Sequence, residues 1–304
     1  MTQAIQVVSA PAKLNLHLQV VGKRSDGYHE LRTLYQSIDL TDEVRGSART
    51  DGVIDLTVVP AGSVVAGDSN LVTRAAVALR EWSGTSLGAQ LELRKNIPVG
   101  SGLGGGSADA AAALVLLEAL WDLDLEIGAL REIAAGIGTD VTFFLCGGSA
   151  WGTGRGDQIQ PLPDRVDCAV LVCLPEIEVL TAEVFSEYPC RLFSKEVDAA
   201  VFAFVVGRGK PPWKRFFNDL EPLVTEKWPE IDRALRSLRA THPLHSAVTG
   251  TGAAVFGVYP DAGAALQAAQ DLGGNWRFQV ASMLGRVESK LVARPVEIRE
   301  EDRE

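Results

Sequence analysis

Apolar and polar side chains alternate over the first part of the chain. Within residues 5–21, the apolar side chains Leu14, Leu16 and Leu18 stand at every second position, which is the period of a strand with one buried face. This segment is predicted to form two strands with a polar kink between them. The same reasoning predicts extended segments over residues 31–40, 53–59, 89–93, 168–174 and 278–283, and short ones around a glycine turn at 247–258.

Other stretches place apolar residues three or four positions apart, which is the spacing of an amphipathic helix. Residues 69–82 have this spacing, with Ser69 or Asn70 as the candidate N-cap. Further helices are predicted over residues 108–121, 125–135, 140–145 and 262–272, and one or two over 220–240. Strands and helices do not alternate strictly, so the order favours an α+β fold. Two prolines and a charge at 161–164 precede a new strand, which predicts domains over 1–163 and 164–304.

The composition is that of an ordinary folded protein. The 304 residues are 46% hydrophobic and 22% charged, which argues against disorder. The net charge of −10 argues against general binding to nucleic acid or to anionic membranes. No signal peptide is visible, and the most apolar stretch is too short to span a bilayer. We therefore expect a cytoplasmic protein whose partners are small molecules.

Three further features carry little functional information. The four cysteines form no Cys-x-x-Cys pair and are expected to be scattered reduced thiols: Cys146, Cys168, Cys173 and Cys190. Residues 190–217 are basic and aromatic without clear periodicity, and they form either a segment that covers the substrate or a variable loop. Residues 297–304 carry five acids against two arginines, which is typical of a solvated tail.

The segment PVGSGLGGGS at residues 98–107 is the most informative part of the sequence. It holds five glycines within residues 100–106, after a predicted strand and before a predicted helix. Glycine lets the backbone turn tightly and approach a ligand. The free N–H groups and the dipole at the start of the following helix favour an anion. The sequence therefore predicts a phosphate-binding loop.

Two familiar phosphate motifs fit this loop only in part. Residues 100–105 satisfy G-x-G-x-x-G, but no acidic residue follows at the end of a second strand, as a dinucleotide fold requires. Gly106 stands where a P-loop needs its lysine. Cations must therefore come from elsewhere in the chain, and the candidates are Lys13, Lys23, Arg24, Arg94 and Lys95.

Three segments together resemble the three signature motifs of the GHMP kinases, a superfamily of small-molecule kinases. They are PAKLNL at residues 11–16, the glycine loop at 98–107, and VTGTGAAVF at 248–256. GKRSDGYHEL at residues 22–31 and NDLEPL at 218–223 narrow the resemblance to a branch whose substrate carries a cytidine diphosphate. The resemblance implies a two-domain fold with the active site in the cleft between the domains. It also implies transfer of the ATP γ-phosphate to the C2 hydroxyl of an erythritol unit, in the non-mevalonate route to isoprenoids.

The same resemblance assigns the catalytic positions. Asp140 would be the general base toward the attacking hydroxyl, although an aspartate before residues 141–145 suits a helix N-cap equally well. Lys13 would orient that aspartate and offset developing charge. Asn15 would hydrogen-bond the substrate near the reacting centre.

Binding positions follow in the same way. Tyr28 and His29 fall where the family binds cytosine, and Thr181 and Phe185 lie in a stretch that resembles the second wall of the cytidine pocket. The positions implied for ATP are Asn70, Lys95, Pro98, Gly100, Gly102, Leu103, Gly104, Gly105, Gly106 and Ser107. ATP chemistry implies Mg²⁺, whose protein ligands the sequence leaves unknown.

The sequence departs from the family pattern at a few positions and leaves two alternatives open. Ala108 follows Ser107 where a second serine is common, so a second hydroxyl contact to phosphate or Mg²⁺ is in doubt. The protein could be another GHMP kinase, of the mevalonate or homoserine type, or a ligand sensor that keeps the fold without catalysis. Tyr28 and His29 argue against the first alternative, and the presence of Lys13 and Asp140 argues against the second.

Overall fold

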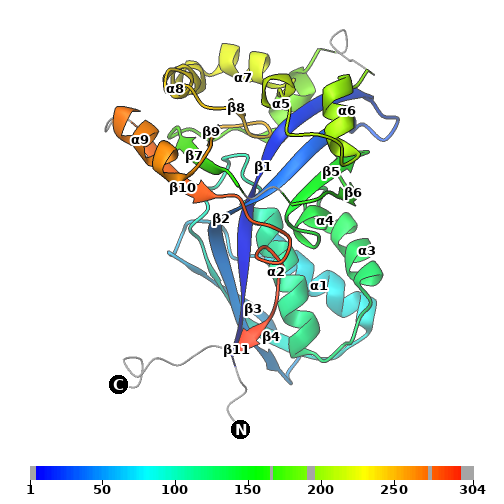
Figure 1. The fold of residues 1–304 in the computed structure, drawn as a ribbon. Helices are drawn as coiled ribbons and strands as arrows, with labels where there is room; N and C mark the ends of the chain where they lie inside the picture. The colour runs from blue at the N-terminus through cyan, green and yellow to red at the C-terminus, as the bar shows by residue number, and fades with distance from the viewer. Residues whose placement is uncertain (1–4, 165–166, 190–195, 273–275, 296–304) are drawn as a thin grey trace.

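Two β-sheets organise the computed structural model, which describes residues 5–164, 167–189, 196–272 and 276–295 (Figure 1). The first sheet has the strand order β11-β1-β2-β4-β3, with β5 beside β2 and β6 beside β5. Its strands are β1 (Gln6–Lys23), β2 (His29–Arg49), β3 (Ile54–Val59), β4 (Gly88–Arg94), β5 (Ser149–Thr153), β6 (Gln158–Pro161) and β11 (Arg294–Pro295). All pairs are antiparallel except β3–β4.

The second sheet is antiparallel and has the order β10-β7-β9-β8. Its strands are β7 (Ala169–Leu174), β8 (His245–Val248), β9 (Val255–Tyr259) and β10 (Arg277–Ser282). Every residue of β7 is buried, as expected for the apolar run predicted there. The α+β class is confirmed.

Helices pack around each sheet. With the first sheet lie α1 (Leu71–Ser83), α2 (Gly105–Leu120), α3 (Ile127–Ile137) and α4 (Val141–Phe144). The remaining helices are α5 (Thr181–Glu187), α6 (Ala199–Val205), the 3-10 turn η2 (Trp213–Arg215), α7 (Glu221–Lys227), α8 (Pro229–Arg239) and α9 (Ala262–Leu272). None of the described helices is long and apolar enough to cross a membrane.

Strand β1 links the two parts of the molecule, as Figure 1 shows. Its apolar side chains enter three hydrophobic clusters in turn: Val8 the cluster around α1 and α2, Leu14 a cluster with β7 and β9, and Val20 one with α8. Side chains alternate along a strand, so Lys13 and Asn15 point away from Leu14. The strand therefore carries two polar groups on the face opposite Leu14.

Several element boundaries differ from the prediction. Residues 6–23 form one strand, with a register shift between Pro11 and Ala12 instead of a break. Helix α2 begins at Gly105, three residues earlier than predicted, so two loop glycines belong to its first turn. The helical stretch 220–240 is divided at Trp228, which ends α7 and precedes Pro229 at the start of α8. The elements β5, β6, α5 and α6 were not predicted.

The cysteine prediction is tested for three of the four residues. Cys146, Cys168 and Cys173 are free thiols. Cys190 lies outside the described residues, as do residues 297–304 and part of the segment 190–217.

Candidate active site

A single large cleft of about 1040 Å³ gathers most of the predicted site residues. Its walls come from β1 and β2, the glycine loop, the start of α2, α5 and the turn at residues 250–252. Of the residues implied for catalysis and binding, Leu103 alone does not line it, and of the candidate cations Arg24 and Arg94 do not line it either. The Leu103 side chain is fully buried in a hydrophobic cluster, and its carbonyl accepts the N–H of Lys13 at 2.9 Å.

The glycine loop holds together the three segments singled out in the sequence. Ala254 N–H donates to the Ser101 carbonyl at 3.0 Å, which ties the third segment to the loop. Gly102 has φ +78°, and a Cβ there would lie 2.2 Å from the Thr249 carbonyl oxygen. A Cβ on Gly104 would lie 3.0 Å from Lys13 Cε. Only glycine permits these approaches.

The first turn of α2 opens into this cleft. Gly105, Gly106 and Ser107 all line it, and the N–H groups of a helix's first turn have no partner within the helix. With the dipole of a 16-residue helix behind them, these N–H groups form an anion site that needs no formal charge.

Lys13 and Asp140 meet beside that helix start. Lys13 Nζ lies 3.4 Å from Asp140 Oδ2, and the Lys13 side chain is 4% exposed against 29% for Asp140. Lys13 Nζ also donates to Asn15 Oδ1 at 2.5 Å, while Asn15 Nδ2 donates to Thr33 Oγ1 at 2.7 Å. This chain of hydrogen bonds fixes the ammonium group in front of the carboxylate.

The position of Asp140 bears on its capping role. It is the residue before α4, but its side chain makes no capping hydrogen bond. Its carboxylate instead accepts a hydrogen bond from the Tyr35 hydroxyl at 3.0 Å on Oδ1. The carboxylate is therefore held by side chains of β1 and β2.

An aromatic cluster forms the other end of the cleft. The His29 ring stacks on Phe185 with centroids 5.2 Å apart, and Tyr28 is 51% exposed at the cleft. Burial and, second, the charge of Lys23 lower the pKa of His29 below its ordinary value. Thr181 Oγ1 lies 3.2 Å from Thr251 Oγ1, which joins this wall to the third segment.

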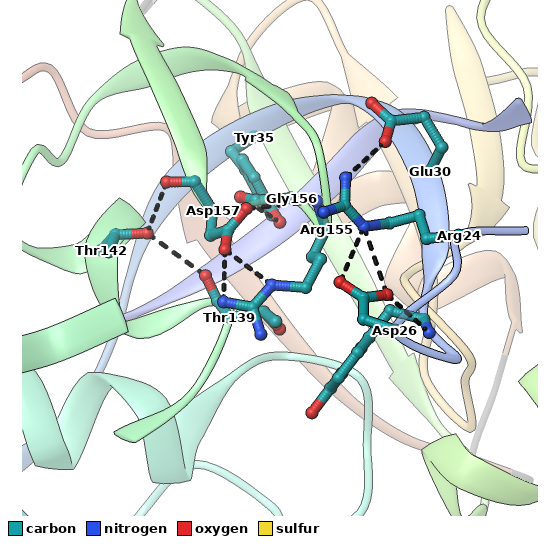
Figure 2. A network of polar contacts seen from close by, with 10 residues as sticks. Arg24, Asp26, Glu30, Tyr35, Thr139, Thr142, Arg155, Gly156 and Asp157 are labelled. Carbon is teal, nitrogen blue, oxygen red and sulfur yellow. Dashed lines mark hydrogen bonds and ion pairs between the residues drawn. The ribbon is translucent and has the colours of Figure 1, made fainter. Parts of the chain in front are cut away.

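The turn between β5 and β6 supplies a residue that sequence reasoning missed. The Arg155 guanidinium lies 5.0 Å from the centroid of the Tyr28 ring, within range of a cation–π contact. Asp157 Oδ2 accepts from Arg155 Nε at 2.8 Å and Nη2 at 2.6 Å, as Figure 2 shows. The sequence has a glycine on each side of Arg155. This pattern indicates a tight turn, but it does not indicate that Tyr28 lies beside the turn.

Two of the residues assigned to ATP also serve the scaffold. Asn70 is the N-cap of α1, and its Oδ1 accepts the N–H of Val72 at 2.9 Å. Lys95 Nζ is paired with Asp42 and lies 2.7 Å from Asp109 Oδ2. The ammonium charge of Lys95 is therefore already compensated by two carboxylates.

Arg24, another of the candidate cations, is likewise paired with acidic side chains. Arg24 Nη1 lies 2.8 Å from Glu30 Oε2, and Arg24 Nε lies 3.1 Å from Asp26 Oδ2, as Figure 2 shows. Lys23 lines the cleft.

Within the described ranges, no group of three or more His, Cys, Asp or Glu side chains could hold a metal ion.

Comparison with known proteins identifies the class that this fold and cleft define. The family profile for the GHMP kinases N terminal domain matches residues 70–148. The profile for the GHMP kinases C terminal domain matches residues 213–277. A structure of homoserine kinase from Cytophaga hutchinsonii shares the fold, with a TM-score of 0.74 at 19% identity over 97% of this chain and 98% of that chain.

More similar relatives narrow the class. A 4-diphosphocytidyl-2-C-methyl-D-erythritol kinase from Cupriavidus taiwanensis is 40% identical over 269 residues, which are 88% of this chain and 89% of the relative. One from Pseudomonas putida is 41% identical over 252 residues, 83% of each chain. A crystal structure of 4-(cytidine 5'-diphospho)-2C-methyl-D-erythritol kinase has a TM-score of 0.74 at 33% identity, covering 92% of this chain and 99% of that chain. This chain therefore belongs to the GHMP kinases and, within them, to the 4-diphosphocytidyl-2-C-methyl-D-erythritol kinase family.

Proposed function

We propose that this protein transfers the γ-phosphoryl group of ATP to the C2 hydroxyl of 4-diphosphocytidyl-2-C-methyl-D-erythritol, in the non-mevalonate route to isoprenoid precursors. The observation that carries the proposal is the pair Lys13–Asp140, 3.4 Å apart at the start of α2. Family membership and the aromatic cluster at the other end of the cleft support the choice of substrate. Phosphoryl transfer asks a protein mainly for positioning and charge stabilisation.

In this proposal Asp140 accepts the proton of the attacking hydroxyl. The hydroxyl oxygen forms a bond to the γ-phosphorus, the bond from that phosphorus to the bridging oxygen breaks, and ADP leaves. Lys13 offsets the negative charge that spreads over the transferring group, and Asn15 holds Lys13 while contacting the acceptor near the reacting hydroxyl. The contacts among these three side chains support these roles.

ATP would lie along the glycine loop, with its phosphates at the first turn of α2 and its nucleoside toward Asn70 and Lys95. Mg²⁺ commonly binds through substrate phosphates, a few waters and one or two protein oxygens. The Ser107 hydroxyl is the protein oxygen that we assign to it. When bound, the ion would neutralise charge on the phosphates.

The cytidine would bind at the aromatic end of the cleft. Tyr28 offers a stacking face, His29 offers ring and backbone groups for the edge of the base, and Thr181 and Phe185 form the facing wall. Mevalonate and homoserine carry no base for these groups to bind, so the cluster favours the cytidyl substrate over the alternatives within the fold.

We also propose where the protein works, what it binds and how its chain divides into domains. We propose that the protein works in the cytoplasm, that its partners are small molecules rather than nucleic acid, and that residues 1–163 and 164–304 are its two domains. The acidic net charge supports the second. The change of sheet between β6 and β7 supports the third, although β11 returns to the first sheet.

A single assay tests the function. Purified protein, ATP, Mg²⁺ and 4-diphosphocytidyl-2-C-methyl-D-erythritol are expected to yield a new phosphomonoester signal in the ³¹P spectrum. Mevalonate and homoserine are assayed in the same way as alternative substrates and are expected to give no comparable turnover. Absence of product, or equal turnover of an alternative substrate, would refute the assignment.

Replacing Asp140 tests its role as the base. Asp140→Asn keeps the shape of the side chain but removes the proton acceptor, so turnover is expected to fall about 10²- to 10⁴-fold. ATP affinity, measured by calorimetry, is expected to stay near that of the wild type. Wild-type turnover in this variant would leave Asp140 as a purely structural residue.

A further inference from the structure

Tyr35 lies behind the proposed base and was not singled out by its sequence context. It belongs to β2, is 2% exposed, and stacks on Phe143 of α4 with ring centroids 4.7 Å apart. Its hydroxyl lies 3.0 Å from Asp140 Oδ1 and 3.3 Å from the Gly156 carbonyl oxygen. A phenol has one proton to donate, and the closer acceptor is also the charged one, so the bond goes to Asp140.

The β5–β6 hairpin leaves room for this tyrosine. A Cβ on Gly152 would lie 2.7 Å from Tyr35 Cε2, and a Cβ on Gly156 would lie 2.6 Å from the Tyr35 hydroxyl oxygen. Figure 2 shows the hydroxyl directed at the turn that contains Gly156 and Asp157. Glycine at both positions therefore allows the ring and its hydroxyl to sit against the hairpin.

The surroundings keep the hydroxyl protonated. Burial and, next, the charge of Asp140 raise the pKa of Tyr35 well above its ordinary value. The titratable groups around this contact are Lys13 of β1, and Asp157 with its partner Arg155 of the hairpin. The Tyr35 hydroxyl therefore keeps its proton at neutral pH and donates it to Asp140.

We infer that Tyr35 is a positioning residue for the reaction: its hydroxyl holds Asp140 Oδ1, so that Oδ2 faces Lys13 and the acceptor hydroxyl. This inference rests on the proposed function of Asp140. A carboxylate that accepts a hydrogen bond is stabilised in its charged form. The bond therefore orients the base and adds a donor to its charged carboxylate.

The variant Tyr35→Phe separates these effects from mere packing, because phenylalanine fills the same ring position and lacks only the hydroxyl. Turnover is measured between pH 4 and 9 with both substrates saturating, so that the range reaches down to the ordinary pKa of a carboxyl group, about 3.9. Without the donor, the carboxylate binds its proton more readily. The acid limb of the kcat profile is expected to move upward by about half to one pH unit, with kcat at pH 7 about three- to tenfold lower. The KM of each substrate is expected to change less than about twofold, because Tyr35 acts through Asp140.

A matched control is Tyr259→Phe. Tyr259 is also buried, at 3% exposure, and its hydroxyl lies 2.5 Å from Thr241 Oγ1, outside the cleft lining. This variant is expected to lower the melting temperature about as much as Tyr35→Phe and to leave the pH profile where it is.

The outcomes are distinguishable. The acid limb is normalised to each variant's own maximum, so a reduced amount of folded enzyme cannot move it. If the limb of Tyr35→Phe superimposes on that of the wild type or moves to lower pH, the inference on Tyr35 is overturned and the proposed function stands. If the wild type itself does not phosphorylate the cytidyl substrate, it is the proposed function that fails.

Discussion

Two lysines line the same cleft and are buried to the same degree, yet their surroundings differ. Lys13 is 4% exposed and Lys95 is 5% exposed. Lys95 faces the carboxylates of Asp42 and Asp109, which are themselves buried. Among the carboxylates of the described residues, Lys13 is paired only with Asp140, which is 29% exposed. A fully compensated buried charge serves the scaffold, whereas a charge with one partly exposed partner is free to act on a substrate.

The scaffold role of Lys95 extends through Asp42. The Asp42 carboxylate is fully buried, accepts the N–H of Asn96, and accepts that of Ile97 at 2.7 Å. These contacts tie the end of β4 to β2, while Asp109 ties both to α2. The group as a whole positions the segment that leads into the glycine loop.

The largest loss of stability is expected for Lys95→Met. It removes the cation and leaves two acidic side chains buried together, so at pH 9, above the Asp109 pKa of about 8, the free energy of unfolding is expected to fall by about 3–5 kcal/mol. Urea denaturation measures the loss. In the double variant Lys95→Met/Asp109→Asn, one of the two charges is gone, and a substantial part of the loss is expected to return. Wild-type stability in the single variant would contradict the scaffold role.

Lys13→Met is expected to show the opposite pattern. It removes the group that offsets charge on the transferring phosphoryl, so kcat is expected to fall about 10²- to 10³-fold. Asp140 keeps contact with solvent and with Tyr35, so the stability loss is expected to be smaller than for Lys95→Met. Steady-state kinetics and urea denaturation of Lys13→Met and Lys95→Met test this contrast. If Lys13→Met proved the less stable of the two and remained active, the contrast between the lysines would be lost.

A smaller effect concerns the pH dependence of stability. Burial above all raises the pKa of Asp109 to about 8; Lys95 opposes the shift and Asp42 adds to it. The pKa of Lys95 is itself raised, because Asp109 and Asp42 together outweigh the opposing effect of burial. The pKa of Asp109 is thus raised because its carboxyl is buried and shares one cation with Asp42.

The consequence follows from proton binding. The folded state holds the Asp109 proton more tightly than the unfolded chain, whose carboxyl has a pKa of about 3.9. The resulting stabilisation is complete below about pH 4 and is lost as the pH rises to about 8. Asp109→Asn has no such proton, so its stability is expected to fall less between pH 5 and 8, by at least about 1.4 kcal/mol, the value of one pKa unit. Thermal unfolding at both pH values measures this; parallel curves for variant and wild type would count against it.

Local pattern was enough for much of the fold. The alternation around Leu14 is a strand, the apolar run at 169–174 is buried β7, and Asn70 caps α1 as one of the two candidates proposed. The glycine loop, with a strand before it and a helix after it, lies where its residue types indicated. The GHMP kinase family, suggested by three short motifs, is confirmed by relatives over most of the chain.

Other elements carry too weak a local signal to predict. Strands β5 and β6 have five and four residues and are separated by a glycine-rich turn. Helix α5 has seven residues, and its first and fifth residues, Thr181 and Phe185, entered the prediction only through family resemblance. Short elements contain too few repeats of a period to stand out from noise.

Residue types and their order follow from the sequence alone: a glycine loop before a helix, a lysine and an asparagine on one face of a strand, and an aspartate before a short helix. Which of the two lysines keeps a charge for chemistry depends on contacts between distant segments. Asp109 and Asp42 compensate Lys95 from 14 and 53 residues away, and Tyr35 reaches Asp140 across 105 residues. The periodicity of a segment reports which of its faces is buried, whereas the partner of a buried charge depends on how distant segments pack.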